Sequence, residues 1–244
     1  MAVSGKEPGK GSDSCRYFKR DSTADMIKVS PSGISYLMEC PRCLWLHVNE
    51  DKRRPRGIFP SLPDGMDNVF KKYFDEYRMR RETPPEIEGK VEGTLYPDLK
   101  QLNAWREFNF GRGGIRAEIP EYDMMLSGAI DDLLLTPDGK FVPFDFKTRG
   151  YPTKEDTHEH YRHQIDLYAL LFQKNGMEPA DFGYLLFFWP ESYSLGMANF
   201  KTDLVKMDVS PSRAMSLLAD VHGIITGPVP SSHEACEYCA YRGS

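Results

Sequence analysis

The strongest constraint on the fold is a predicted β-hairpin between residues 128 and 148. Two strongly apolar segments flank the sequence Thr136-Pro-Asp-Gly-Lys140. Pro-Asp-Gly is typical of a type I turn followed by a glycine in the left-handed conformation. The two segments are therefore expected to pair as antiparallel strands, with Thr136 opposite Lys140.

This register brings acidic residues together. Counting back along both strands from the turn places Asp131 opposite Asp145 and Ala129 opposite Lys147. Directly opposed side chains lie about 5 Å apart at Cβ, and two carboxylates at that distance repel unless a cation lies between them. A two-residue loop would instead bring Asp132 opposite Asp145. A solvent-facing hairpin with unrelated Asp and Lys residues is the simplest alternative.

The predicted pair has the chemistry of a divalent metal site. Carboxylate oxygens are typical ligands of Mg²⁺ or Mn²⁺. Lys147 lies two residues after Asp145, so both side chains are expected on the same face of the strand. A bound metal ion activates water, and a lysine beside it can orient that water or stabilise charge on a phosphate. The pattern thus favours phosphodiester hydrolysis.

The same residues resemble a known family. Gly128-x-x-Asp131, followed by Asp145-x-Lys147, resembles the PD-(D/E)XK nuclease superfamily, and Gln164-x-x-x-Tyr168 resembles the motif that follows the catalytic strands in its RecB-like branch. The resemblance implies that Asp131 and Asp145 bind the metal and that Lys147 assists the attacking water. It also implies that Gln164 and Tyr168, which share a helix face, position the DNA backbone or the lysine.

The resemblance carries expectations about function. It implies a Mg²⁺- or Mn²⁺-dependent DNA nuclease with exonuclease action on single strands or DNA ends. The expected settings are DNA repair and recombination or CRISPR adaptation, beside a helicase or integrase partner. The alternative is a catalytically degenerate DNA-binding or assembly module, and a third possibility is a zinc-stabilised interaction domain with an incidental acidic pair. The chain has no phosphate-binding P-loop, so it is not itself a helicase motor.

Four cysteines form two Cys-x-x-Cys pairs near the ends of the chain, Cys40 with Cys43 and Cys236 with Cys239. In a reducing compartment this spacing favours a metal over disulfides. RecB-like exonucleases, including CRISPR-associated adaptation exonucleases and AddB nuclease domains, often carry a 4Fe-4S cluster, so the resemblance implies one here. A third C-terminal cysteine is missing, however, and a two-plus-two set is also a common Zn²⁺ arrangement.

A second departure concerns the metal site. The family usually supplies a histidine ligand from a helix before the strands, but no histidine lies between His47 and His158. Asp67 and Glu118 are the candidate replacements. The histidines at 158, 160 and 163 are interpreted as surface residues near a helix start. They do not form the zinc deaminase motif.

The charge balance gives no global attraction to nucleic acid, since the net charge is -5. DNA binding would depend on local basic runs, for which the alternative is an ordinary solvated face. The candidate runs are Lys52, Arg53, Arg54 and Arg56; Lys71 and Lys72; and Arg78, Arg80 and Arg81.

Periodicity predicts an α/β fold, a PD-(D/E)XK restriction-endonuclease-like core with a mixed central sheet flanked by helices. Residues 1–27 are expected to be a flexible tail and 28–244 a single domain. Within it, residues 28–60 and 228–240 would form a cysteine clasp that joins the two ends of the chain. No apolar run is long enough to span a bilayer and no secretory signal is visible, so a cytoplasmic location is expected.

Overall fold

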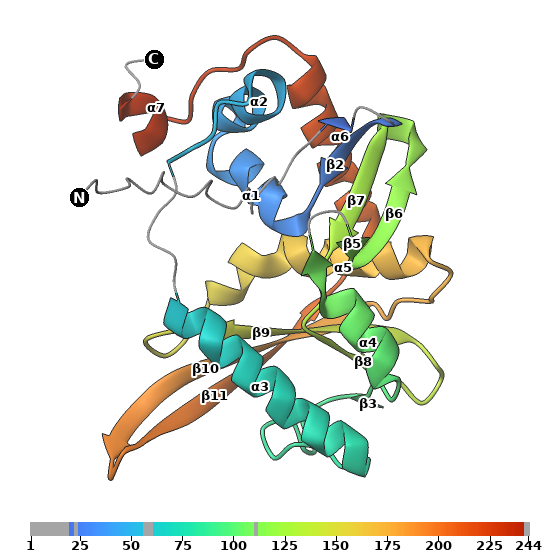
Figure 1. Ribbon diagram of the computed structural model, residues 1–244, viewed down its shortest axis with the longest axis vertical. Helices are drawn as coiled ribbons and strands as arrows, with labels where there is room; N and C mark the ends of the chain where they lie inside the picture. The colour runs from blue at the N-terminus through green and yellow to red at the C-terminus, as the bar shows by residue number, and fades with distance from the viewer. Residues whose placement is uncertain (1–19, 22–23, 56–60, 110–111, 242–244) are drawn as a thin grey trace, which may run out of the picture.

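The computed structural model describes residues 20–21, 24–55, 61–109 and 112–241. Its elements lie in two layers of strands with helices around and between them (Figure 1). The helices are α1 (Pro31–Glu39), α2 (Pro41–Glu50), α3 (Ser61–Arg80), α4 (Leu99–Arg106), α5 (Arg162–Lys174), α6 (Pro211–Thr226) and α7 (Glu237–Tyr241), with 3₁₀ turns η1 (Pro120–Tyr122) and η2 (Thr157–Tyr161). The predicted α/β class is confirmed.

The strands form two main sheets and a small ribbon. One sheet has the order β1-β2-β7-β6, and the other, of mixed direction, has the order β11-β10-β9-β8-β3. The strands are β1 (Arg20–Asp21), β2 (Ala24–Val29), β3 (Thr94–Leu95), β4 (Phe108–Asn109), β5 (Arg112–Gly113), β6 (Ile115–Ile119), β7 (Met124–Gly128), β8 (Asp132–Leu135), β9 (Phe141–Thr148), β10 (Phe182–Ser194) and β11 (Met197–Asp208).

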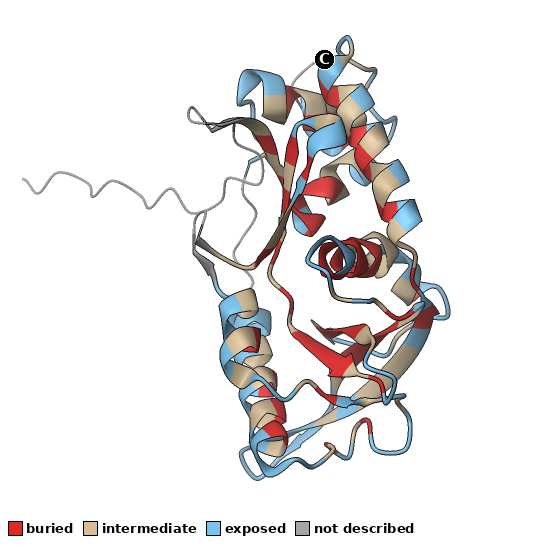
Figure 2. Ribbon diagram, turned by 90° about the vertical axis from the view of Figure 1, so that its right-hand side faces the viewer, coloured by how far each residue is buried: buried red, intermediate tan, exposed pale blue. Residues whose placement is uncertain are grey.

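Helix α5 is the central element of the core. Every residue from Ile165 to Phe172 is buried, because the helix contacts β6 and β7 of one sheet and β9 of the other. Figure 2 shows this buried helix end-on between the two layers of strands. A helix that is buried all round must place its polar groups where they have partners, which gives Gln164 and Tyr168 fixed surroundings.

The predicted hairpin is confirmed in turn and register. The N–H of Thr136 donates to the carbonyl of Lys140 at 3.0 Å, and Gly139 adopts φ +85°, a conformation that favours glycine. Asp132 pairs with Phe144 and Leu135 with Phe141, as counting from the turn predicts. The shorter loop, which would pair Asp132 with Asp145, is therefore excluded.

Strand β8 begins only at Asp132. Asp131 and Ala129 precede it, so the predicted strand pairs with Asp145 and Lys147 are not formed. Instead, Asp131 lies in the bend where the chain passes from β7 in the first sheet to β8 in the second.

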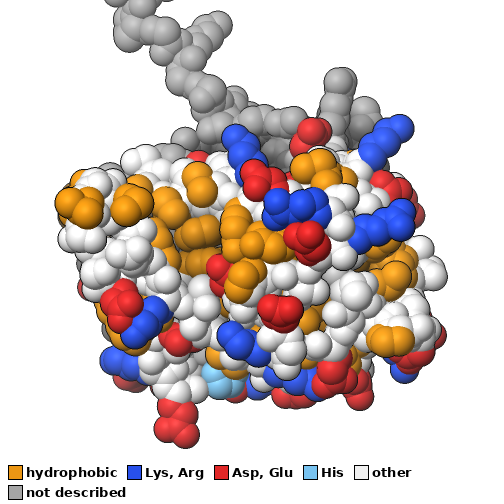
Figure 3. Space-filling model, turned by 90° about the horizontal axis from the view of Figure 1, so that it is seen from below, with side chains coloured by type: hydrophobic (Ala, Val, Ile, Leu, Met, Phe, Trp, Pro, Cys, Tyr) orange, Lys and Arg blue, Asp and Glu red, His pale blue; other side chains and the backbone are white. Residues whose placement is uncertain are grey.

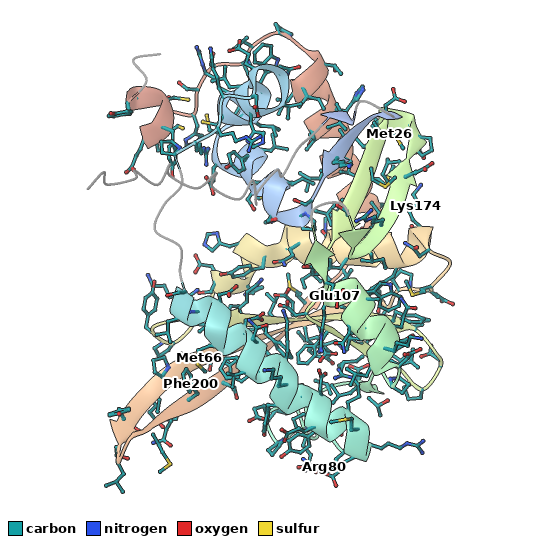
Figure 4. The ribbon with its side chains drawn as sticks, viewed as in Figure 1. Met26, Met66, Arg80, Glu107, Lys174 and Phe200 are labelled. Atoms are coloured by element: carbon teal, nitrogen blue, oxygen red, sulfur yellow. The ribbon has the colours of Figure 1, made fainter. Side chains whose placement is uncertain are left out.

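Other elements differ from the periodicity in detail. Pro41 separates α1 from α2, because proline lacks the N–H that a continuous helix needs. Residues 61–65 form the first turn of α3 although they include Pro63 and Gly65. Helix α4 was not predicted. Strands β10 and β11 extend into a long two-stranded arm, and Figure 4 labels Met66 and Phe200 where α3 packs near its base.

Most of the predicted tail, residues 1–19 and 22–23, falls outside the described residues, whereas the predicted boundary between residues 27 and 28 lies within β2. Within the described part, β2 already runs from Ala24 and pairs with β7. No helix in the described ranges has the length and apolar character needed to cross a bilayer.

Candidate active site

The site is built around the bend that carries Asp131. Arg106 of α4 donates from Nε to the backbone carbonyl of Asp131 at 2.7 Å, and the N–H of Phe146 donates to its Oδ2 at 3.2 Å. The backbone pairing of β8 with β9 ends at Asp132 and Phe144, and beyond it the Asp131 carboxylate accepts the hydrogen bond from β9. These two contacts fix the residue at the junction between the sheets.

Asp145 and Lys147 on β9 form the second part of the site. The Lys147 ammonium lies 2.6 Å from Asp145 Oδ2 and donates to Gln164 Oε1 at 2.8 Å. Gln164 in turn donates from Nε2 to Asp145 Oδ1 at 3.1 Å. The Asp145 side chain is fully buried, and the Lys147 ammonium also lies 4.6 Å from the centre of the Tyr161 ring.

The helix residues of the Gln-x-x-x-Tyr motif hold this arrangement from behind. Gln164 Nε2 donates to the Tyr168 hydroxyl at 2.8 Å, and that hydroxyl donates to the Ala129 carbonyl at 2.7 Å. Gly128 makes the approach possible, because a Cβ there would lie 3.1 Å from the Tyr168 ring. The motif residues therefore connect Lys147 to the chain that leads into Asp131.

Helix α3 contributes two residues that line the same site. The Lys71 ammonium lies 2.7 Å from Asp131 Oδ1 and 2.6 Å from Asp67 Oδ2. Asp67 thus stands next to Asp131, where the sequence suggested a replacement for the histidine. Glu118, the other candidate, is exposed on β6 and has no described contact with these residues. Lys71 was considered only for DNA binding, although its spacing of four from Asp67 on a helix is a usable signal.

The charges shift the ionisation of these groups. Burial, opposed by Lys147 and reinforced by Asp131, raises the pKa of Asp145 to about 7. For Asp131, burial is outweighed by the nearby ammonium groups of Lys71 and Lys147, which lower its pKa. Burial opposes the charge on Lys147, but Asp145 and Asp131 raise its pKa overall. The site is thus a compact set of coupled carboxylates and ammonium groups.

The donor set fits a divalent ion. Asp131, Asp145 and Asp67 offer the hard carboxylate oxygens that Mg²⁺ or Mn²⁺ requires. Asp145 Oδ2 accepts no hydrogen bond of good geometry among the described residues, and only the charge of Lys147 offsets its burial. Among the residues described, however, only the four cysteines bring three or more potential ligand atoms within 4.8 Å of one another. In the acidic site, Lys71 and Lys147 are paired with the carboxylates of Asp67, Asp131 and Asp145.

Asp132, next to Asp131, belongs to a separate buried ion cluster. Its carboxylate pairs with Arg78 and, at 3.3 Å, with Arg106, and both arginines also pair with Asp75. The side chains of Asp132 and Arg78 are almost fully buried. This cluster joins α3 and α4 to the start of β8, so it supports the site without belonging to it.

Several residues of the predicted basic runs have internal partners. Lys71 and Arg78 face the carboxylates described above, and Arg54 pairs with Glu39 and lies over the rings of Tyr36 and Tyr238. Arg56 lies outside the described residues. Figure 3 shows one face of the molecule, on which basic and acidic side chains alternate around a hydrophobic patch. A continuous basic track is not visible on that face.

The four cysteines come together, as the spacing predicts. Cys43 Sγ lies 3.6 Å from the sulfurs of Cys236 and Cys239, and Cys40 Sγ lies 3.8 Å from that of Cys239. These distances are far longer than a disulfide bond of about 2.05 Å. All four residues are buried, and they join α1, α2 and α7. The cluster is a possible metal site that ties the N-terminal segment to the C-terminal one.

The thiols are not equivalent. Burial raises the pKa of Cys40, but backbone hydrogen bonds from His233 and Cys43 and contacts with the neighbouring thiols lower it to about 7. Burial and hydrogen bonds with the other thiols raise the pKa of Cys239 to about 12. Four thiolates at this spacing would repel strongly, so a cation is needed before all four can ionise.

Comparison with known proteins defines the class. A family model described as the PD-(D/E)XK nuclease superfamily matches residues 60–244, which include the hairpin, the Gln-x-x-x-Tyr motif and the second cysteine pair. The chain therefore belongs to this superfamily, whose members are nucleases that use divalent metals.

Among solved structures, the chain is similar in fold to the crystal structure of SSO0001. The chain is 14% identical to it, with a TM-score of 0.43, over 88% of this chain and 84% of that chain. No curated protein matches the chain.

Proposed function

We propose that the protein is a Mg²⁺- or Mn²⁺-dependent deoxyribonuclease of the RecB-like branch. The main observation that supports this proposal is the hydrogen-bonded set Asp145, Lys147 and Gln164, which lies beside Asp131 in a chain of the PD-(D/E)XK superfamily. A half-buried lysine held against the fully buried Asp145 carboxylate is costly for folding, which supports a functional reason for the arrangement.

The roles of the residues follow from their contacts. Asp131 and Asp145 would hold the metal, which when bound supplies a Lewis acid that activates water and neutralises charge on the phosphate. Lys147 would donate to the attacking water or to a phosphate oxygen. Gln164 fixes the lysine through Oε1, and Tyr168 fixes the glutamine. The network thus keeps one ammonium proton donor aimed at the carboxylates before substrate arrives.

The substrate and setting are part of the proposal. We propose DNA, as single strands or ends, with exonuclease action in DNA repair or CRISPR adaptation beside a helicase or integrase. The RecB-like motif supports this branch, because Gln164 and Tyr168 contact each other on α5. We also keep a single nuclease domain over residues 28–244 and a cytoplasmic location as proposals.

For the cysteine clasp, we propose a structural Zn²⁺ ion, in place of the 4Fe-4S cluster that the resemblance implies. A tetrahedral ion with Zn–S bonds of about 2.3 Å keeps its sulfurs about 3.8 Å apart. The distances of 3.6 and 3.8 Å between the cysteine sulfurs agree with that geometry. A 4Fe-4S cluster binds its cysteines through four different iron atoms, which requires more widely spaced thiolates.

The test of the nuclease proposal is cleavage of end-labelled single- and double-stranded DNA with Mn²⁺. Lys147→Ala is compared with Lys174→Ala, a control at the other end of α5 (labelled in Figure 4), ten residues or about 15 Å of helix beyond Gln164. We expect Lys147→Ala to lose at least about 100-fold in rate, the scale of a lost electrostatic or proton-transfer group, and Lys174→Ala to retain activity.

The outcomes separate the proposals. Release of mononucleotides from the ends supports exonuclease action, whereas fragments cut at internal positions support endonuclease action and reject the exonuclease proposal. Equal cleavage by both variants rejects the assigned site. The absence of cleavage by folded wild-type protein favours the degenerate DNA-binding module, which the missing histidine between His47 and His158 also supports.

A further inference from the structure

The Lys71 ammonium lies between two carboxylates of the proposed metal site, Asp67 and Asp131. Asp131 Oδ2 accepts a hydrogen bond from the backbone N–H of Phe146, whereas Oδ1 accepts no backbone hydrogen bond among those described and is the oxygen nearer to Lys71. That oxygen is in an ion pair with Lys71 at 2.7 Å. A divalent ion bound there at about 2.1 Å and an ammonium at 2.7 Å cannot share the same side of one oxygen.

Lys71 is also the donor that can leave most easily. The Phe146 N–H is part of β9, and Lys147 is held by Asp145, Gln164 and the Tyr161 ring. The contacts described for Lys71 are two carboxylates only, and its flexible stem extends from the surface helix α3 with the side chain 19% exposed. Movement of this one ammonium would release Asp131 without disturbing the sheet.

The same movement frees a third carboxylate. Lys71 binds Asp67 Oδ2 at 2.6 Å, so both oxygens face one cation between them. Asp67 is half-buried on the side of α3 that faces Asp131. Departure of the ammonium would leave one oxygen of Asp67 and one of Asp131 directed at the same point. Asp67 would then supply the ligand for which the sequence has no histidine.

We propose that the Lys71 ammonium occupies the divalent-ion position in the metal-free protein, and that metal binding displaces it and recruits Asp67 as a ligand beside Asp131 and Asp145. The inference rests on the proposed function, because it assumes that Asp131 and Asp145 bind the metal. It adds a competing ammonium group to that function and selects Asp67 over Glu118 as the third ligand. Metal loading and the Lys71–Asp131 ion pair are mutually exclusive.

The test is Mn²⁺ binding to the full chain, measured by calorimetry and by electron paramagnetic resonance without DNA. Lys71→Met is compared with Lys72→Met, which removes the same charge from the next, exposed residue. We expect Lys71→Met to bind Mn²⁺ about tenfold more tightly than Lys72→Met, a coupling of ordinary size for two competing ligands. In the Lys71→Met background, Asp67→Asn should remove most of that gain.

Thermal unfolding gives a second readout on the same samples. Without metal, Lys71→Met should melt below Lys72→Met, because Asp67 and Asp131 lose their shared cation, and Mn²⁺ should raise its melting temperature by more than that of wild type. Lys71→Gln, which keeps polarity, repeats the comparison if Lys71→Met does not fold.

Two results would overturn the inference in different ways. Mn²⁺ binding by wild type with equal or weaker binding by Lys71→Met rejects the competitor and leaves the proposed nuclease site intact. Failure of every protein to bind Mn²⁺ rejects the metal site itself and the proposed function with it. Binding by Lys71→Met but not by wild type supports the inference in its strongest form.

Discussion

Two neighbouring residues, Asp131 and Asp132, have opposite surroundings. Asp131 lies at the bend before β8, where its carboxylate faces Lys71 and Phe146. Asp132 is the first residue of the strand, so its side chain points the other way, into the ion cluster with Arg78 and Arg106. Sequence alone presents two equivalent aspartates, but the turn register separates a site residue from a structural one.

We therefore predict different consequences of mutating them. Asp132→Ala leaves two buried guanidinium groups with too little negative charge and should cost about 3–5 kcal/mol of unfolding free energy. Asp131→Ala should cost clearly less, because its carboxylate is partly accessible to solvent. Urea denaturation of metal-free protein measures both values. Similar losses for the two variants would contradict the separation.

The pH dependence of metal binding follows from Asp145. Its pKa in the metal-free protein is raised to about 7, so below pH 7 a proton competes with the metal for the carboxylate. We predict that Mn²⁺ affinity falls by up to about tenfold per pH unit as the pH drops below 7, and levels off above it. Calorimetry from pH 5.5 to 8.5 measures this, and a flat profile across pH 7 would be inconsistent with a protonated Asp145.

At the scale of elements, the cysteine clasp joins pieces that otherwise share few contacts. Helix α7 has only five residues, too short to be stable alone, and its Cys239 reaches the sulfurs of Cys40 and Cys43. A metal bound at this point would therefore stabilise both the C-terminal segment and the α1–α2 pair. The two proposed metal sites share no residue, so they can be tested independently.

For the clasp we predict one Zn²⁺ per chain, measured by elemental analysis of protein that is purified without chelator. The same protein should show no visible absorption from iron and sulfide. Cys239→Ser should lower the zinc content and release the C-terminal segment to proteases. Lys147→Ala should retain full zinc. A brown protein with four irons and four sulfides per chain would refute the single-ion assignment.

At the scale of the whole molecule, local patterns predicted the elements that matter most. The Thr136-Pro-Asp-Gly-Lys140 turn and the strand register beside it follow from turn chemistry, and the break between α1 and α2 follows from the geometry of Pro41. The contact between Gln164 and Tyr168 follows from their spacing on a helix. Each of these features depends on neighbours within a few residues, which a sequence displays directly.

Features that depend on distant segments were not predictable in the same way. The position of Lys71 beside Asp131 results from how α3 packs across β9. The spacing of four between Asp67 and Lys71 indicates an ion pair on the helix, but it does not show that this pair faces Asp131. Helix α4 was missed although its Arg106 holds the Asp131 carbonyl. The spacing of cysteines indicated a metal, but only the distances between their sulfurs favour one ion over a cluster.

The most direct test of the account measures Mn²⁺ binding and Mn²⁺-dependent DNA cleavage on the same samples of Asp131→Asn, Asp145→Asn and Asp138→Asn. Asp138 is a matched control, because it lies in the exposed turn of the same hairpin. We predict that the first two variants lose both binding and cleavage, while Asp138→Asn keeps both. Cleavage that survives in Asp131→Asn and Asp145→Asn would contradict the central claim that this carboxylate pair holds the catalytic metal.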